Sequence, residues 1–391
     1  MRVTRVLGAL AISAALFLAA CQPSASESPS TSESAGASEP ASVEPASVSV
    51  VLQWVPQAQF AGYYAAAALG YYEDEGLDVE IIPGGPDVFP QVEGSKPDGP
   101  EFAVSWVPKV LIARESETGS DLVNIAQIFQ RAGTLSVSWV DSGITSVEDF
   151  AGKKVGAWGF GNELEVVASA TLVGLEDGVD YTRVEQPFDM TLLINAYDGC
   201  AAADTDCVDV AEAMIYNEYA QLLETANPDT GELFQPEDLN VIDYNDVGTA
   251  MLQDAVWARA SWLAEGNNED VAVRFLKATF RGWIYCRDNP AECEQFVVDA
   301  GSTLGAGHQQ WQMNEISNLI WPSPDGIGIL DPAAWDQMVE TALAGGILAG
   351  EPSADAYRTD LAQAALDALA DEDTTGGGWE KAVVEITPGG E

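Results

Sequence analysis

Up to about residue 261, two kinds of hydrophobic pattern alternate along the chain. Valine-rich apolar runs predict strands at 47–54, 77–82, 101–106, 122–129, 134–140, 153–158, 181–186 and 239–244. Segments between them, such as 60–76 and 162–175, carry apolar residues at helical spacing. Strands that alternate with helices predict an α/β protein with largely parallel sheets.

Beyond residue 261 the pattern is almost purely helical. Apolar residues three and four apart predict helices at 270–286, 308–320, 332–346 and 355–370. We find no repeat of fixed period along the chain.

The order of these segments is typical of a protein with two lobes, in which the chain crosses to the second lobe and returns. We expect the crossing near residues 131–140 and the return near 246–258. Lobe one then comprises 48–132 and 250–391, and lobe two comprises 133–249. The C-terminal helices are expected to pack on lobe one, and a cleft with a hinge is expected between the lobes.

The N-terminus reads as an export signal. Arg2 and Arg5 precede the apolar run 6–20, which is short for a membrane-spanning helix. The "LAAC" that ends at Cys21 resembles the lipobox of bacterial lipoproteins, in which the cysteine is acylated after removal of the signal peptide, here 1–20. Acyl chains on Cys21 would hold the protein on the extracytoplasmic side of the cell membrane.

The segment that follows the proposed anchor predicts a disordered tether. Residues 21–47 contain no aromatic side chain and are rich in serine, glutamate, proline and alanine. Such a segment cannot bury enough apolar surface to offset the entropy of ordering.

Composition adds one unusual property to a sequence that is otherwise typical of a globular protein, with 47% hydrophobic and 20% charged residues. There are 62 acidic and 16 basic residues, which gives a formal net charge of -46. This charge repels phosphate backbones, so nucleic acid is excluded as a partner.

The cysteines beyond the anchor form two pairs, each seven residues apart: Cys200 with Cys207, and Cys286 with Cys293. In an exported protein this spacing favours two local disulfides, with free thiols as the alternative. A metal site is not expected, because neither pair has zinc-ligand spacing and His308 is the single histidine.

Five motifs resemble the thiamine-pyrimidine-synthase-like family of substrate-binding proteins of ABC importers. They are "LQWVPQAQFAGYYAAAALGYYEDEGLDVEIIPGG", "FAVSWVPKVL", "GKKVGAWGFGNELEV", "AEAMIYNEYAQLLE" and "YCRDNPAEC". The resemblance implies a type II periplasmic-binding-protein fold, a small-molecule ligand, and permease and ATPase subunits as partners. We expect a monomer without a cofactor.

The same family contains a fungal enzyme that makes the thiamine pyrimidine from its own histidine and pyridoxal phosphate. In this chain Gln53 replaces the aspartate of the family's opening motif, and the histidine position falls at or next to Phe60. The resemblance therefore implies a binding protein and not an enzyme. A surface lipoprotein with a sensory role is the alternative from another functional class.

Three tryptophans follow predicted strands at the ends where a cleft should open: Trp54, Trp106 and Trp158. Together they predict an aromatic site for a planar heterocycle. Riboflavin is the first expectation, since the opening motif resembles flavin-importing members. A thiamine pyrimidine precursor is the second expectation and an alkylsulfonate the third.

The first turn of the opening helix supplies further candidates. Gln59, Phe60 and Tyr63 are expected in the site beside Gln53, whereas Tyr71 and Tyr72, near the end of the helix, are assigned to packing.

The second lobe is expected to contribute two groups. Asn162 and Glu163, with the backbone N–H groups from Phe160 onward, begin a helix that should face the cleft. Tyr216, Asn217 and Glu218 lie where the strand-like "AEAMI" passes into a helix, and Tyr216 and Glu218 are ligand candidates.

Three other polar residues receive no ligand role. Asp246 and Asp254 flank the return crossing and are predicted as hinge or rim residues. His308 is predicted as a polar residue at the start of a helix, and no catalytic set is evident.

Overall fold

The computed structural model describes residues 44–116, 119–201 and 203–391. The predicted signal peptide, Cys21 and most of the tether lie outside the described residues. The first strand, β1, begins at Ala46, so the tether prediction extends two residues too far. No helix of the described ranges is long and apolar enough to cross a bilayer.

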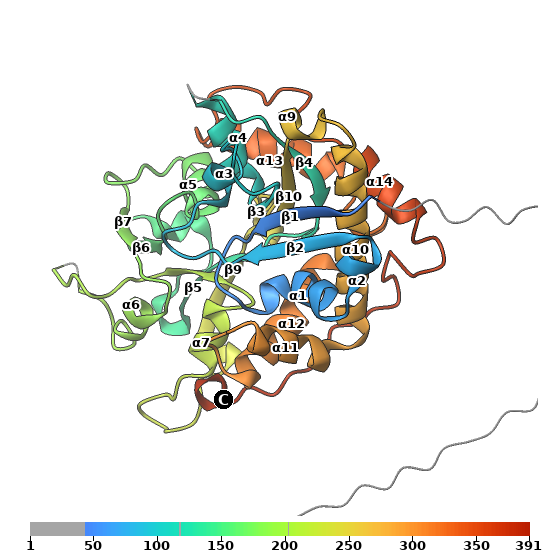
Figure 1. Ribbon diagram of the computed structural model, residues 1–391. Helices are drawn as coiled ribbons and strands as arrows, with labels where there is room; N and C mark the ends of the chain where they lie inside the picture. Colours follow the sequence, from blue (N-terminus) through green and yellow to red (C-terminus); the bar gives the residue numbers. More distant parts are fainter. Residues whose placement is uncertain (1–43, 117–118, 202) are drawn as a thin grey trace, which may run out of the picture. The chain divides into compact units, whose positions relative to one another are not determined.

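The first sheet has five strands in the order β2-β1-β3-β10-β4 (Figure 1). In chain order the bounds are β1 Ala46–Val51, β2 Leu77–Ile82, β3 Phe102–Ser105, β4 Leu122–Gln127 and β10 Ala255–Arg259. Strand β1 runs parallel to β2 and β3, whereas β10 is antiparallel to both β3 and β4. Every residue of β3, β4 and β10 is buried, which explains their nearly continuous apolar sequences.

The other two sheets are smaller. One has the order β8-β5-β9 and is antiparallel, and the other pairs β6 with β7 in parallel. Their bounds are β5 Thr134–Trp139, β6 Lys154–Ala157, β7 Thr182–Glu185, β8 Ala211–Met214 and β9 Leu239–Asp243. The eight strands predicted from valine-rich runs are confirmed as elements. The prediction of largely parallel sheets is wrong, because β5 and β10, which lie on the two crossings between the sheets, each run antiparallel to both neighbours.

Helices cover these sheets. The α-helices are α1 Ala61–Ala68, α2 Tyr71–Asp74, α3 Pro90–Glu93, α4 Val107–Glu115, α5 Leu164–Leu172, α6 Thr191–Ile194, α7 Glu218–Leu223, α8 Tyr244–Val247, α9 Ala260–Leu263, α10 Asn268–Asp288, α11 Pro290–Asp299, α12 Ala306–Ile320, α13 Pro332–Ala344 and α14 Asp360–Asp367. The short 3-10 helices are η1 Ala58–Phe60, η2 Val140–Ser142, η3 Val147–Phe150, η4 Pro236–Asp238 and η5 Pro388–Gly390. Helix α10 packs against α1 and α14 beside the five-stranded sheet (Figure 1).

The C-terminal helices contact both groups of strands. The indole of Trp311 in α12 donates to the carbonyl of Ile215, which follows β8. Helix α13 packs against α5, and the C-terminus lies beside α7, where the N–H of Gly389 donates to the carbonyl of Glu224 (Figure 1). The C-terminal helices, which were expected on lobe one, thus contact the second group of strands as well.

The two crossing segments connect the five-stranded sheet with the three-stranded sheet. Hydrogen bonds join the two segments to each other. The side chain of Gln253 accepts from the N–H of Gly133 and donates to Thr134 Oγ1. The side chain of Asn245 exchanges hydrogen bonds with the backbone of Ala132 in both directions. The two crossings thus form one bonded unit.

Disulfides join Cys200 to Cys207 and Cys286 to Cys293. The second bond connects α10 with α11, and both of its cysteines are fully buried.

Candidate functional site

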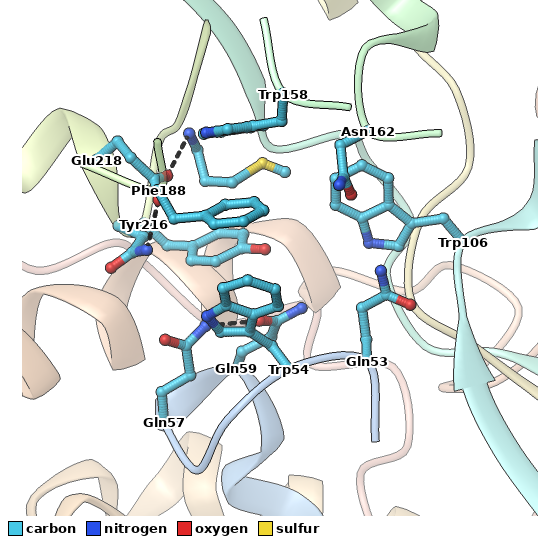
Figure 2. A pocket seen from close by; sticks show the side chains of 12 residues that line it. Gln53, Trp54, Gln57, Gln59, Trp106, Trp158, Asn162, Phe188, Tyr216 and Glu218 are labelled. Carbon is cyan, nitrogen blue, oxygen red and sulfur yellow. Dashed lines mark hydrogen bonds between the residues drawn. The ribbon is translucent and has the colours of Figure 1, made fainter. Parts of the chain in front are cut away.

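A cavity lies between the ends of strands from the five-stranded sheet and those of the smaller sheets. We call it the inner chamber, and its lining (Figure 2) consists of Gln53, Trp54, Gln57, Gln59, Trp106, Trp158, Asn162, Phe188, Met214, Tyr216, Asn217 and Glu218. Eight of the eleven predicted ligand residues line it.

Aromatic rings dominate the inner chamber. Figure 2 shows the rings of Trp158, Phe188 and Trp54 layered one above another. The centroid of the Phe188 ring lies 4.5 Å from that of Trp54 and 6.0 Å from that of Trp158. The Phe188 and Trp158 planes differ by only 20°, which is a stacked arrangement.

The turn after β1 fixes Trp54. Its carbonyl accepts from the N–H of Gly84, which follows β2, at 2.9 Å. A Cβ atom on Gly84 would lie 2.2 Å from the carbonyl oxygen of Leu52, so only glycine permits this close approach of the two turns.

Trp106 and Trp158 also follow strands, β3 and β6, as predicted. The backbone N–H of Trp158 donates to Glu212 Oε2 at 2.8 Å, and its indole donates to the carbonyl of Pro187 at 3.2 Å. Burial raises the pKa of Glu212 well above its usual value, and the hydrogen bond from Trp158 acts in the opposite direction.

Asp254 lies outside the lining of the inner chamber and forms hydrogen bonds with two residues of that lining. Its carboxylate accepts from Gln59 Nε2 and from the indole of Trp106, each at 2.9 Å. Burial raises the pKa of Asp254 to about 6, and these two hydrogen bonds act in the opposite direction. Asp254 is 2% exposed, so its prediction as a rim residue is wrong, whereas its prediction as a hinge residue stays a prediction. Asp246 is exposed in α8.

Helix α12 supports the loop before η1. The N–H of Ala58 donates to the side-chain oxygens of Gln309 and Gln312, at 2.7 and 3.1 Å. Gln312 also donates to Gln57, which in turn donates to Gln59. A chain of neutral amides therefore positions this wall of the inner chamber.

Glu218 is the acidic residue of the lining. Its oxygens accept from Asn217 Nδ2 at 2.7 Å and from the N–H of Met214 at 3.0 Å. Burial raises the pKa of Glu218 to about 7. Near neutral pH this group is thus present in both its protonated and its ionised form.

His308 connects the lining to α7. It is 2% exposed, with Nε2 2.8 Å from Asn217 Oδ1 and Nδ1 2.8 Å from Glu224. His308 lies in the first turn of α12, so its prediction as a residue at a helix start is confirmed. Its burial was not predicted.

Glu163 does not line the inner chamber. It accepts from the N–H of Gly161 at 2.9 Å and lies 3.8 Å from Arg183. The N–H of Asn162 donates to the carbonyl of Gly159. The expectation of open N–H groups at this helix start is therefore wrong at two positions, because the turn uses those donors itself.

Phe60 and Tyr63 are likewise absent from the lining. Both are fully buried in the core around α10, where the Tyr63 ring meets Trp283 edge-on at 6.1 Å. The helix directs them away from the cleft, so their prediction as ligand residues does not hold in this structure. Tyr72 is a core residue, as expected, whereas Tyr71 is half-buried beneath Arg281.

Four lining residues were not among the ligand candidates: Gln57, Phe188, Met214 and Asn217. Phe188 lies three positions after the end of β7. It could therefore have been predicted in the same way as the tryptophans, from its place just after a strand. The sequence predicts Asn217 at the strand-to-helix junction between β8 and α7, but not as a ligand residue. Gln57 and Met214 carried no such signal.

The arrangement suits binding of a planar molecule more than chemistry on it. Five rings and several amides line the inner chamber, and the described residues contain no cluster of histidine, cysteine or acidic side chains that could hold a metal ion. The His308 ring is fully engaged with Asn217 and Glu224.

Residues 57–293, more than half of the chain, match the profile of a family described as NMT1/THI5 like. The chain belongs to the NMT1/THI5-like family. The resemblance noted from the sequence motifs is thereby confirmed.

Two curated proteins are similar to this NMT1/THI5-like chain. The riboflavin-binding protein RibY of Chloroflexus aurantiacus is 27% identical over 311 residues, which cover 77% of this chain and 81% of that protein. A formylaminopyrimidine-binding protein of Halalkalibacterium halodurans is 26% identical over 336 residues, which cover 83% and 89%.

Solved structures share the fold. The alkanesulfonate-binding protein SsuA of Xanthomonas axonopodis pv. citri, bound to MOPS, superposes with a TM-score of 0.56 at 13% identity, covering 81% of this chain and 99% of that one. The fold is the type II periplasmic-binding-protein fold, as predicted. Both curated relatives and this solved structure are named as binding proteins.

Proposed function

We propose that the protein is the lipid-anchored, extracytoplasmic binding component of an ABC importer, and that its ligand is riboflavin or a closely related planar heterocycle. The two groups of strands act as lobes that close over the ligand, and the bonded crossings act as the hinge. The closed complex delivers the ligand to the permease.

The layered rings carry the choice of ligand class. Stacking on an aromatic side chain contributes on the order of 1 to 3 kcal/mol per base-like ring. Trp54 and Trp158 come from opposite sides of the inner chamber, so a ring system that displaces Phe188 from the space between them gains two such faces. A tricyclic ring makes fuller use of this lining than a single pyrimidine ring. The name of the similar RibY protein supports the same choice.

A pyrimidine precursor is the second candidate. Glu218 supplies a carboxyl group to the lining, and the amino groups of a pyrimidine could donate to a carboxylate. Its two oxygens already accept from Asn217 and Met214, which favours the flavin. For an alkylsulfonate, the described lining of the inner chamber offers no lysine or arginine.

Titration of riboflavin with purified protein tests the proposal. Stacking on tryptophan should quench flavin fluorescence strongly at micromolar concentrations. Competition with formylaminopyrimidine and with an alkylsulfonate distinguishes the other candidates. Unchanged flavin fluorescence, together with binding of the pyrimidine by calorimetry, would replace the first candidate with the second.

A further inference from the structure

A second cavity adjoins the inner chamber and shares part of its lining. We call it the outer chamber. Four side chains line both cavities: Gln53, Trp54, Asn162 and Phe188. A ligand held between the rings of the inner chamber would therefore have the outer chamber directly beside it.

The outer chamber differs from the inner one in its chemistry. Beyond the shared residues it is lined by Gln91 and Lys109, and by the rings of Phe89 and Phe160. The two phenyl rings lie 5.7 Å apart. Phe160 is 64% exposed and has a φ of 64°, a left-handed conformation that is unfavourable for a side chain of this size. The turn thus holds an apolar ring at the mouth of the cavity at a cost in backbone energy.

Two amides of this cavity each have a hydrogen-bonding atom without a partner among the described residues. Gln53 is 7% exposed, and its Oε1 is buried without a hydrogen bond. Gln91 Nε2 donates to nothing among the described residues, and Gln91 Oε1 has only a long contact of 3.5 Å with Ser105 Oγ. A buried acceptor without a donor is costly, so the Gln53 oxygen calls for a hydroxyl or N–H group from a ligand.

One charged side chain, that of Lys109, lines the outer chamber, and its contacts are with neutral groups. Its Nζ donates to Asn162 Oδ1 at 2.6 Å and lies 4.7 Å from the centroid of the Trp106 ring. Burial lowers the pKa of Lys109 to about 8, while Glu163 and Asp254 oppose that change. The net charge of -46 on the chain opposes the approach of an anion to the cavity.

We propose that the outer chamber is a second subsite, which holds an uncharged, hydroxyl-bearing chain attached to the planar ring of the ligand. The hydroxyl groups bond to the side chains of Gln53 and Gln91, and the carbon atoms of the chain lie against Phe89 and Phe160. This inference rests on the proposed function and specifies the part of the ligand that lies outside the ring site.

Three flavins test it: lumiflavin, which has the ring without the hydroxylated chain; riboflavin; and riboflavin 5'-phosphate. Two neutral hydrogen bonds of ordinary strength, to Gln53 and Gln91, should make the intact protein bind riboflavin roughly thirty-fold more tightly than lumiflavin. The phosphate should bind more weakly than riboflavin. In Gln91→Ala the preference for riboflavin should fall several-fold, with the affinity for lumiflavin unchanged. Gln295→Ala, at an exposed position on α11, is the matched control and should keep the full preference.

Equal affinity of the intact protein for riboflavin and lumiflavin would overturn the inference and leave the proposed function standing. Tighter binding of riboflavin 5'-phosphate than of riboflavin would show that the subsite prefers a charged group, and it would overturn the inference of an uncharged chain. An equal loss of affinity for both neutral flavins in Gln91→Ala would assign that residue to the ring site instead. If no flavin binds, the proposed function fails, and this inference fails with it.

Discussion

The phenyl ring of Phe188 lies 4.5 Å from the indole of Trp54, although the two residues follow strands of different sheets. Phe188 is half-buried in a loop after β7, between the exposed residues Pro187 and Asp189. Its ring occupies part of the space between Trp54 and Trp158, where a planar ligand gains its two stacking faces.

Replacement of Phe188 tests whether this ring must leave before the ligand enters. In Phe188→Ala the space between the tryptophans is vacant from the start, so we expect the association rate constant for riboflavin to rise several-fold. Stopped-flow quenching of flavin fluorescence measures it. An unchanged association rate with faster dissociation would show that Phe188 is instead a permanent wall of the site.

Replacement of Trp54 should weaken the complex without unfolding the protein, because Trp54 is only partly buried. Loss of one stacking face predicts a roughly 10- to 100-fold higher Kd for riboflavin in Trp54→Ala. Trp379→Ala is the control, since Trp379 is also partly buried and lies outside the lining. Equal affinities of the two variants would contradict the assignment of Trp54.

Replacement of Glu165 should alter how stability depends on pH. Burial raises the pKa of Glu165 from 4.5 to about 7. Between these values the folded protein binds more protons than the unfolded chain, so the free energy of unfolding falls as pH rises through this window. A shift of this size corresponds to about 3 kcal/mol.

Denaturant unfolding of Glu165→Gln at pH 5 and pH 8 measures this effect. The loss of stability between the two pH values should be smaller in the variant than in the unaltered protein. Glu237→Gln, at an exposed position before β9, should show the loss of the unaltered protein. The same loss in all three proteins would rule out Glu165 as its source.

Removal of a disulfide should lower the free energy of unfolding by an amount that depends on the length of the loop that the disulfide closes. Each bond closes a loop between cysteines seven residues apart, for which chain entropy predicts a loss of about 2 to 3 kcal/mol. The double variant Cys286→Ala/Cys293→Ala should lose somewhat more than Cys200→Ala/Cys207→Ala, because the first pair is fully buried and the replacement also leaves a small void. Equal stability of the variants and the unaltered protein would contradict both predictions.

Much of the fold and part of the site could be predicted from the sequence. Valine-rich runs identify strands because a buried strand needs apolar residues on both faces, and Trp54, Trp106 and Trp158 follow from the rule that clefts open at strand ends. Strand β10 was not predicted, although its sequence "AVWAR" is apolar, because it lies within a segment expected to be a crossing.

Other parts of the site depend on direction and distance, which the sequence pattern does not contain. Phe60 and Tyr63 begin the correct helix, but the orientation of α1 against α10 places their rings in the core. Asp254 lies close in sequence to the return crossing, and only the folded chain brings it to Gln59 and Trp106.

The two amides that hold Ala58, those of Gln309 and Gln312, lie beyond residue 293, where the family match ends. A fragment cut to 57–293 would still be recognised by its motifs, and it would retain Trp106, Trp158 and Phe188. It would nevertheless lose the acceptors that hold the loop before η1 in place. The part of the chain that carries the family match is therefore smaller than the part that holds the site in place.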